Sequence, residues 1–134
     1  MGYFNNKTIW ITGASSGIGR SLTVQLAKLG AKLVITARRK EELENVKLEC
    51  GNADVHIYPF DLSDLDKIDQ FSHSVQEEVG DIDILINNAG ITGPTAALWE
   101  YDVEMWKKVV DINLMGTFNC CRAIVPNMIK NNYG

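Results

Sequence analysis

Cysteine is scarce in this sequence, and the cysteines present form no recognisable pattern. Cys50, Cys120 and Cys121 are odd in number, two of them are adjacent, and none has the spacing of a zinc site. This excludes a disulfide framework of the kind that stabilises small secreted domains. The sequence therefore predicts a reducing compartment and no metal site.

Long hydrophobic runs are also missing. No stretch reaches the roughly 18 apolar residues that suggest a membrane-spanning helix. Near the N-terminus, Asn5, Asn6 and Lys7 stand where a signal peptide would need apolar side chains. We expect a soluble, cytoplasmic protein with no membrane partner.

Basic side chains are too few and too scattered to follow a nucleic acid backbone. The chain has 13 Lys and Arg against 17 Asp and Glu, a formal net charge of −4, and its longest basic cluster is residues 38–40. Nucleic acid binding depends on an excess of positive charge over the phosphates. We expect no nucleic acid partner.

The length and composition of the chain suit one folded unit. It has 134 residues, of which 46% are hydrophobic, and it contains no internal repeat, low-complexity tract or linker. That length and composition are typical of a single globular domain. We predict one domain over residues 1–134.

Short apolar runs alternate with longer amphipathic segments over the first two thirds of the chain. Apolar, β-branched runs of this kind are typical of strands, and the segments between them have the spacing of helices. Because the strands are apolar on both faces, the pattern predicts a parallel sheet covered by helices on two sides. The predicted strands are 8–12, 32–36, 55–58 and 82–86, and the predicted helices are 18–29, 40–49 and 65–79.

The last third of the chain is predicted to be mostly helical. After Gly90 the sequence predicts a loop at 91–97 and two helices at 103–113 and 115–130. Pro126 lies inside the second helix and predicts a kink or an early end, because proline lacks a backbone N–H.

A glycine-rich turn, Thr12 to Gly19, joins the first strand to the first helix. The N–H groups that open a helix have no partner inside it, and the helix dipole makes this end attractive to an anion. Gly13 can adopt a backbone conformation that other residues resist, and Gly17 lets a diphosphate approach the main chain. Gly19 lets the helix pack closely on the sheet. The alternative is that the glycines only make a tight turn.

Four short motifs resemble those of the classical short-chain dehydrogenase/reductase family. The glycines have the spacing Gly-x-x-x-Gly-x-Gly with Thr12 in front, Asp61-Leu62 follows the third predicted strand, and the sequence 87–90 is Asn-Asn-Ala-Gly. Asn113 matches the family's catalytic asparagine. The resemblance covers residues 7–134.

The resemblance implies a fold, a cofactor and a set of site residues. The fold would be a three-layer, Rossmann-type, doubly wound parallel sheet in the order 3-2-1-4, truncated after about four strands. The cofactor would be a nicotinamide dinucleotide, and Asn113 would hold a water molecule in a proton relay. The implied cofactor-binding residues are Gly13, Ser15, Ser16, Gly17, Ile18, Gly19, Arg38, Asp61, Leu62, Asn88, Ala89 and Gly90.

Several of these residues also have simpler interpretations. Asp61 could belong to the cap of the helix near Leu65, where Ser63 or Asp64 is expected to act as the N-cap. Asn87 and Asn88 could simply form a turn that satisfies backbone groups at the sheet edge. Asn113 could be a polar residue bonded to the backbone where one helix passes into the next.

The end of the second predicted strand indicates which dinucleotide is preferred. Enzymes of the family that prefer NAD(H) usually carry a carboxylate there, whereas this chain has Thr36-Ala37-Arg38-Arg39. The planar guanidinium of Arg38 suits a 2′-phosphate. We predict that NADP(H) is preferred and that NAD(H) is possible. Both arginines could instead be solvated, and Ser16 replaces a basic residue that is frequent in NADP-using members.

Three catalytic residues implied by the resemblance are missing from the sequence. Members of the family use a serine and a Tyr-x-x-x-Lys pair to transfer a proton to or from the substrate oxygen. Tyr58, Tyr101 and Tyr133 have no lysine four residues later, and Tyr3 has one only ahead of the first predicted strand. Because general acid–base catalysis contributes about 10²–10⁴-fold, we expect little or no catalysis by this chain alone.

We interpret the chain as the cofactor-binding portion of an oxidoreductase that reduces carbonyl groups or oxidises alcohols. Two alternatives stay open: a non-catalytic module that binds nucleotide or protein, and a self-assembling or engineered half-domain. The sequence indicates neither the substrate nor the direction of reaction.

Homo-oligomerisation is a further expectation. The strand at 82–86 would leave an apolar sheet edge, and unpaired edges promote association. The two helices after Gly90 commonly pair between subunits in the family. Some of their apolar side chains are also expected to cover the chain's own sheet: Trp99, Trp106, Val109, Val110, Phe118, Ile124 and Ile129.

Overall fold

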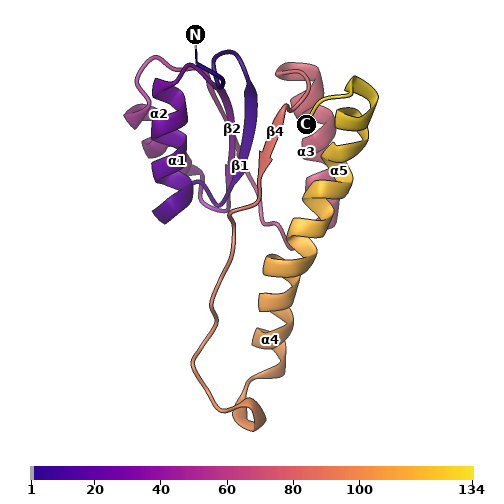
Figure 1. Cartoon of the computed structure of the whole chain (residues 1–134). Coiled ribbons are helices and arrows are strands. Elements are labelled where there is room, and N and C mark those ends of the chain that lie inside the picture. Colours follow the sequence, from indigo (N-terminus) through magenta and orange to yellow (C-terminus); the bar gives the residue numbers. More distant parts are fainter. Residues whose placement is uncertain (1) are drawn as a thin grey trace.

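A parallel sheet of four strands forms the centre of the computed structural model, which describes residues 2–134 (Figure 1). Its strands run in the order β3-β2-β1-β4, which confirms the predicted order. The strand bounds are β1 (Thr8–Thr12), β2 (Lys32–Ala37), β3 (Val55–Pro59) and β4 (Ile84–Ile86).

Helices cover both faces of this sheet. α1 (Gly17–Lys28) and α2 (Lys40–Glu49) lie on one face, and α3 (Leu65–Glu78) and α5 (Gly116–Asn131) lie on the other (Figure 1). The predicted three-layer α/β architecture is therefore confirmed, and it matches a doubly wound sheet, in which the connecting helices change face where the strand order reverses.

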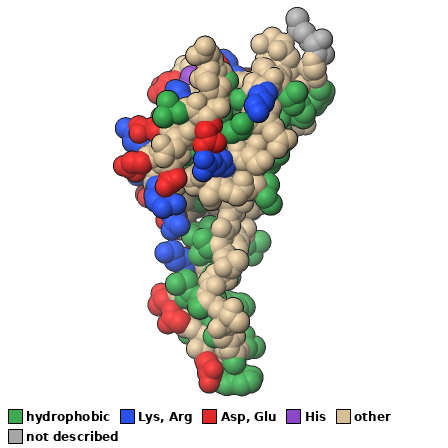
Figure 2. All heavy atoms as spheres, turned by 90° about the vertical axis from the view of Figure 1, so that its left-hand side faces the viewer, with side chains coloured by type: hydrophobic (Ala, Val, Ile, Leu, Met, Phe, Trp, Pro, Cys, Tyr) green, Lys and Arg blue, Asp and Glu red, His purple; other side chains and the backbone are tan. Residues whose placement is uncertain are grey.

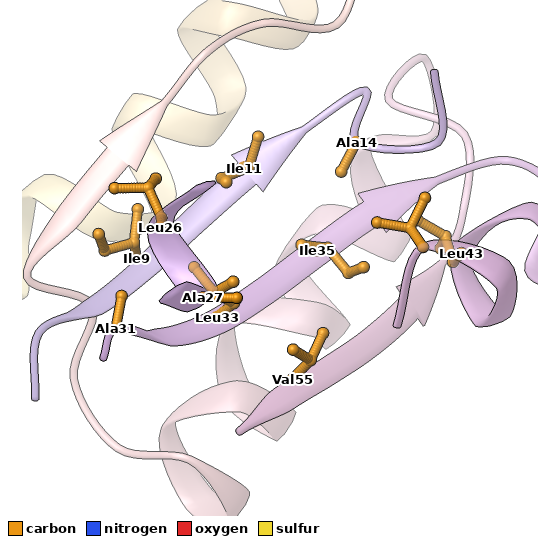
Figure 3. Close-up of a cluster of buried hydrophobic side chains, with 11 residues drawn as sticks. Ile9, Ile11, Ala14, Leu26, Ala27, Ala31, Leu33, Ile35, Leu43 and Val55 are labelled. Carbon is orange, nitrogen blue, oxygen red and sulfur yellow. The ribbon is translucent and has the colours of Figure 1, made fainter. Parts of the chain in front are cut away.

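The two faces of the sheet each carry a separate hydrophobic core. Ile9, Ile11, Leu33 and Ile35 point toward α1 and α2, where Figure 3 shows them beside Leu26, Ala27 and Leu43. Because successive strand residues alternate in direction, the residues between them serve the opposite core. That second core consists of Trp10, Val34, Leu62, Ile68, Phe71, Val75, Ile82, Cys120 and Ile124.

Strand β4 is shorter than the sequence predicted. It begins at Ile84 instead of residue 82, because the Asp83 carboxylate accepts the Thr8 N–H at 2.8 Å. The backbone N–H of Asp83 donates to the Thr8 carbonyl oxygen at 2.9 Å. Asp83 therefore joins the two strands at their N-terminal ends, and Ile82 is left to pack in the core of the α3 face.

The two helices predicted after Gly90 are one continuous helical segment. α4 (Val103–Val110) passes through a turn of π-helix, η2 (Asp111–Met115), directly into α5, and a short 3₁₀-helix, η1 (Leu98–Glu100), precedes them. Figure 1 shows α4 and the long connection from β4 extending away from the sheet.

The early helix end predicted at Pro126 is wrong. α5 continues to Asn131 and ends where Asn132 adopts a left-handed conformation with φ of 51°. Pro126 removes the partner of the Arg122 carbonyl, but both residues are exposed. Water can therefore bond that carbonyl group, so the missing hydrogen bond costs less than it would in a buried helix.

Within residues 2–134, no helix combines the length and the apolar character needed to cross a bilayer.

Candidate functional site

A pocket of about 320 Å³ lies where the carboxyl ends of all four strands meet. Ligands of open parallel sheets bind at this edge, where the strand order reverses. The pocket lies between the loops after β1, β2, β3 and β4, and the N-terminal part of α1. Most of the predicted cofactor residues line it: Gly13, Ser15, Ser16, Ile18, Arg38, Asp61, Leu62, Asn88, Ala89 and Gly90.

The glycine turn leaves the first turn of α1 open toward this pocket. α1 begins at Gly17 after an extended Ser16, and no side chain caps its N–H groups. Its first turn contains no acidic residue, so no carboxylate of the helix itself competes for this end. A Cβ placed on Gly17 would meet nothing within 4 Å, so the main chain there is accessible. This geometry fits a bound diphosphate.

The other two glycines of the turn are required by close packing. Gly13 has φ of 63°, and a Cβ there would lie 2.7 Å from the Ala89 Cα. A Cβ on Gly19 would collide with the carbonyl oxygen of Gly13 and the side-chain amide of Asn88. These contacts bring the loop after β4 against the start of α1.

Thr12 and Asn88 join the loops after β1 and β4. The Thr12 hydroxyl oxygen accepts hydrogen bonds from the backbone N–H groups of Asn88 and Ala89, both at 3.0 Å. The Asn88 side chain donates to the carbonyl oxygens of Thr12 and Gly13, at 3.0 and 3.1 Å. Asn88 therefore lines the pocket while its amide group is bonded to the backbone, in line with the simpler interpretation of this residue.

The role of Thr12 was missed by the sequence analysis, which treated it only as the residue before the glycines. A threonine at the buried end of a strand was the available signal, because a buried hydroxyl group is usually hydrogen-bonded. Thr12 is 1% exposed.

Arg38 and Asp61 face the pocket from the loops after β2 and β3. One oxygen of Asp61, Oδ1, accepts hydrogen bonds from the backbone N–H of Ser63 at 2.9 Å and from its hydroxyl group at 2.8 Å. Partial burial acts to raise the pKa of Asp61, but the two Ser63 bonds, Arg38 and Lys108 together hold it below its ordinary value. The carboxylate is therefore the favoured form.

Asp64 is the residue that caps α3. Its Oδ1 accepts the Lys67 N–H at 3.2 Å, at the N3 position of the helix. Capping is therefore separate from Asp61, whose carboxylate is bonded to Ser63 instead.

Asn113 lies in the π-helical turn and connects it to the loop that follows β4. Its Oδ1 accepts the Ile91 N–H and its Nδ2 donates to the Ile91 carbonyl oxygen, both at 2.8 Å. Its own carbonyl oxygen accepts the Thr117 hydroxyl group at 3.1 Å. Asn113 thus lies just outside the pocket, which its bonding partner Ile91 and its neighbour Ile112 both line.

The tyrosines of the described chain do not line this pocket. The Tyr58 hydroxyl group donates a hydrogen bond to Glu78 at 2.6 Å. Partial burial, and to a smaller extent this hydrogen bond, raises the pKa of Tyr58. The Tyr3 and Tyr133 hydroxyl groups lie 3.2 Å apart, and the Lys7 ammonium group is 4.0 Å from the Tyr133 ring centre. Within the described residues, no group of three His, Cys, Asp or Glu is arranged to hold a metal ion.

Comparison with known proteins agrees with the family resemblance of the sequence motifs. The family model described as "short chain dehydrogenase" matches residues 7–134. The mouse protein "Dehydrogenase/reductase SDR family member 7" is 40% identical over 135 residues, which is 96% of this chain and 40% of the mouse protein. This chain thus spans less than half of that relative.

Solved structures agree closely with the fold. A metagenomic short-chain oxidoreductase in complex with NADP has a TM-score of 0.94 and 32% identity, over 98% of this chain and 60% of its own. An NAD⁺-bound xylitol dehydrogenase has a TM-score of 0.94 and 30% identity, over 99% of this chain and 52% of its own. On the evidence of its fold, its pocket and these matches, the chain belongs to the short-chain dehydrogenase family.

Proposed function

We propose that this chain is the cofactor-binding part of an NADP(H)-dependent oxidoreductase that interconverts carbonyl and alcohol groups. The observation that carries the proposal is the uncapped start of α1, open to a pocket that Arg38 also lines. Helix N-termini bind phosphate groups through free N–H groups and the helix dipole. A nicotinamide dinucleotide supplies the hydride chemistry when it is bound.

Each part of the pocket has a task in this proposal. The N–H groups that open α1 bind the diphosphate, with Ser15 and Ser16 as further hydroxyl donors. Asp61 and Leu62 bind the adenine end, and Ala89 and Gly90 border the path toward the nicotinamide. We assign Asn113 to the proton relay of the parent enzyme, on the basis of the family resemblance.

The preference for NADP(H) is argued from charge. The end of β2 carries no carboxylate, and Arg38 is available to bind a 2′-phosphate through two parallel N–H bonds. The solved structures do not decide the matter, because one was determined with NADP and the other with NAD⁺.

Self-association is the second part of the proposal. Trp99 is 87% exposed, and Val103 and Trp106 are 64% and 51% exposed. Figure 2 shows hydrophobic side chains gathered on the narrow extension that contains α4. Exposed apolar patches of this kind mark interaction surfaces, so we propose a homo-oligomer through α4 and α5 or through the β4 edge.

Calorimetric titration of the chain with NADPH and NADH tests the proposal. We expect both to bind, with NADPH tighter by about ten- to hundredfold if Arg38 makes one charge-assisted pair with the 2′-phosphate. Equal affinities would remove the role of Arg38. Absence of binding by either would overturn the cofactor role and favour the self-assembling, non-catalytic module.

A further inference from the structure

Ser63 holds the Asp61 carboxylate in one orientation at the pocket wall. Both Ser63 hydrogen bonds go to Oδ1, at 2.8 and 2.9 Å. Among residues 2–134, no hydrogen bond is formed to the other oxygen, Oδ2. Asp61, which lines the pocket, thus has Oδ1 held by its own loop and Oδ2 free to accept a hydrogen bond.

The backbone of this loop is fixed independently of the Ser63 hydroxyl group. The Asp64 N–H donates to the Asp61 carbonyl oxygen at 3.0 Å, which closes the turn. The Asp64 carboxylate caps α3, and Leu62 is buried in the core of the α3 face. Loss of the Ser63 hydroxyl group would therefore leave Asp61 Oδ1 held by the Ser63 backbone N–H alone, which loosens the orientation of the carboxylate while the turn is retained.

We propose that Ser63 is a positioning residue, which aims the free Asp61 oxygen at the exocyclic amino group of a bound adenine and so sets selectivity for that base. The inference rests on the proposed dinucleotide function. A carboxylate accepts hydrogen bonds only, so it favours the 6-amino group of adenine and disfavours the 6-carbonyl group of hypoxanthine. Fixing its orientation in advance reduces the entropy lost on binding.

The experiment compares two cofactors on the full chain. NADPH carries adenine, and reduced nicotinamide hypoxanthine dinucleotide phosphate differs at that base. We expect the wild-type chain to bind NADPH more tightly. Ser63→Ala should lower NADPH affinity by about five- to tenfold, the effect of one hydrogen bond, and leave the analogue unchanged. Ser63→Thr keeps the hydroxyl group and should restore the preference.

The dependence of selectivity on pH provides a second readout. Partial burial favours the neutral carboxyl group, whereas Ser63, Arg38 from the loop after β2 and Lys108 from α4 favour the carboxylate. Without the Ser63 hydroxyl group the pKa of Asp61 rises. The preference for adenine, which is lost as pH falls through that pKa, should therefore be lost at a higher pH in Ser63→Ala than in the wild type.

Asp64→Ala is the matched control, since it removes the cap of α3 from the adjacent residue. It should lower the melting temperature and leave base selectivity intact. Equal losses for both cofactors in Ser63→Ala, or no loss for either, would overturn the inference. Equal binding of both by the wild type would overturn it while leaving the proposed function standing. Failure of the wild type to bind either would overturn both.

Discussion

Asn113 and Ile91 exchange two hydrogen bonds of 2.8 Å, so that the side chain of one residue pairs with the N–H and the carbonyl group of the other. The residues are 22 positions apart, and their pairing connects the loop after β4 to the π-helical turn η2. Gly90 lies directly against this pair, because a Cβ there would be 3.3 Å from Asn113 Oδ1.

Replacing Asn113 tests this connection. Asn113→Ala removes both bonds, and because Asn113 is exposed we expect destabilisation of only about 1 kcal/mol. The sharper readout is hydrogen exchange, in which the Ile91 amide should lose its protection. Asn127→Ala is the control. It is also an Asn-to-Ala change in a helix, with the same gain in helix propensity, but Asn127 does not pair with Ile91. Unchanged exchange at Ile91 in Asn113→Ala would contradict the pairing.

A second prediction concerns the Thr12 hydroxyl group, which accepts two backbone N–H groups. Thr12→Val keeps the shape of the side chain and leaves both N–H groups without their partner, so we expect a loss of about 2 kcal/mol in the free energy of unfolding. Chemical denaturation measures it.

Thr23→Val provides the control for that change. Thr23 is also fully buried, but its hydroxyl group only donates to the Gly19 carbonyl oxygen within the same helix. That oxygen keeps its helical hydrogen bond when the hydroxyl group is lost, so we expect a much smaller effect. Equal losses in the two variants would show that the Thr12 bonds contribute little.

The glycine turn provides a third prediction, because two of its glycines serve different purposes. Gly19→Ala introduces a collision with the backbone of Gly13, so it should destabilise the fold by more than about 2 kcal/mol. Gly17→Ala meets open space and carries only the strain of φ of 53°, about 1 kcal/mol. Thermal unfolding of both variants measures the difference.

The order of the two variants in NADPH affinity should differ from their order in stability. In Gly17→Ala the added methyl group lies where a diphosphate would approach, so NADPH affinity should fall although most of the stability is kept. Retention of full affinity in a folded Gly17→Ala chain would show that the phosphates bind elsewhere.

The fourth prediction concerns cofactor preference. Arg38→Ala should weaken NADPH binding by about ten- to hundredfold and leave NADH binding nearly unchanged, since only NADPH carries the 2′-phosphate. Lys40→Ala is the control: it removes the same charge two residues away, from a side chain that pairs with Glu44 at 3.7 Å. Equal effects of the two changes would indicate long-range attraction and no specific contact.

The parts of the fold that depend on local pattern could be predicted from the sequence. The alternation of apolar strands with amphipathic helices indicated the layers, and the glycine turn indicated the start of α1. Asp64 was one of two candidate caps for α3, and only the folded structure distinguishes it from Ser63, because both residues have the right chemistry and occupy neighbouring positions.

Features that depend on contacts between distant segments could not be predicted. The π-helical turn is associated with the pairing of Asn113 and Ile91, and the hydrogen bond between Thr12 and Asn88 joins residues 76 positions apart. Continuation of α5 through Pro126 depends on that residue's exposure, which single-sequence periodicity does not report. Of the apolar side chains considered for oligomerisation, Ile124 covers the chain's own sheet and is 4% exposed.

The final prediction concerns the exposed apolar side chains of the α4 extension. Trp106 is 51% exposed on α4 and packs edge-on against Tyr101, with ring centres 5.4 Å apart. A charged group in a buried subunit interface is costly, so Trp106→Glu should convert an oligomer to monomer in analytical ultracentrifugation.

Lys107→Glu is the control for this change, because it places the same side chain on the neighbouring residue. Lys107 pairs with Glu104 at 3.0 Å on the exposed surface, and such pairs contribute little. We expect this variant to keep the oligomeric state of the wild type. An oligomer that survives Trp106→Glu would place the contact elsewhere and favour the edge of β4, where a strand from a second copy could add to the sheet. A wild-type monomer would remove self-association from the proposal altogether, because Trp99 and Trp106 would then stay exposed in solution.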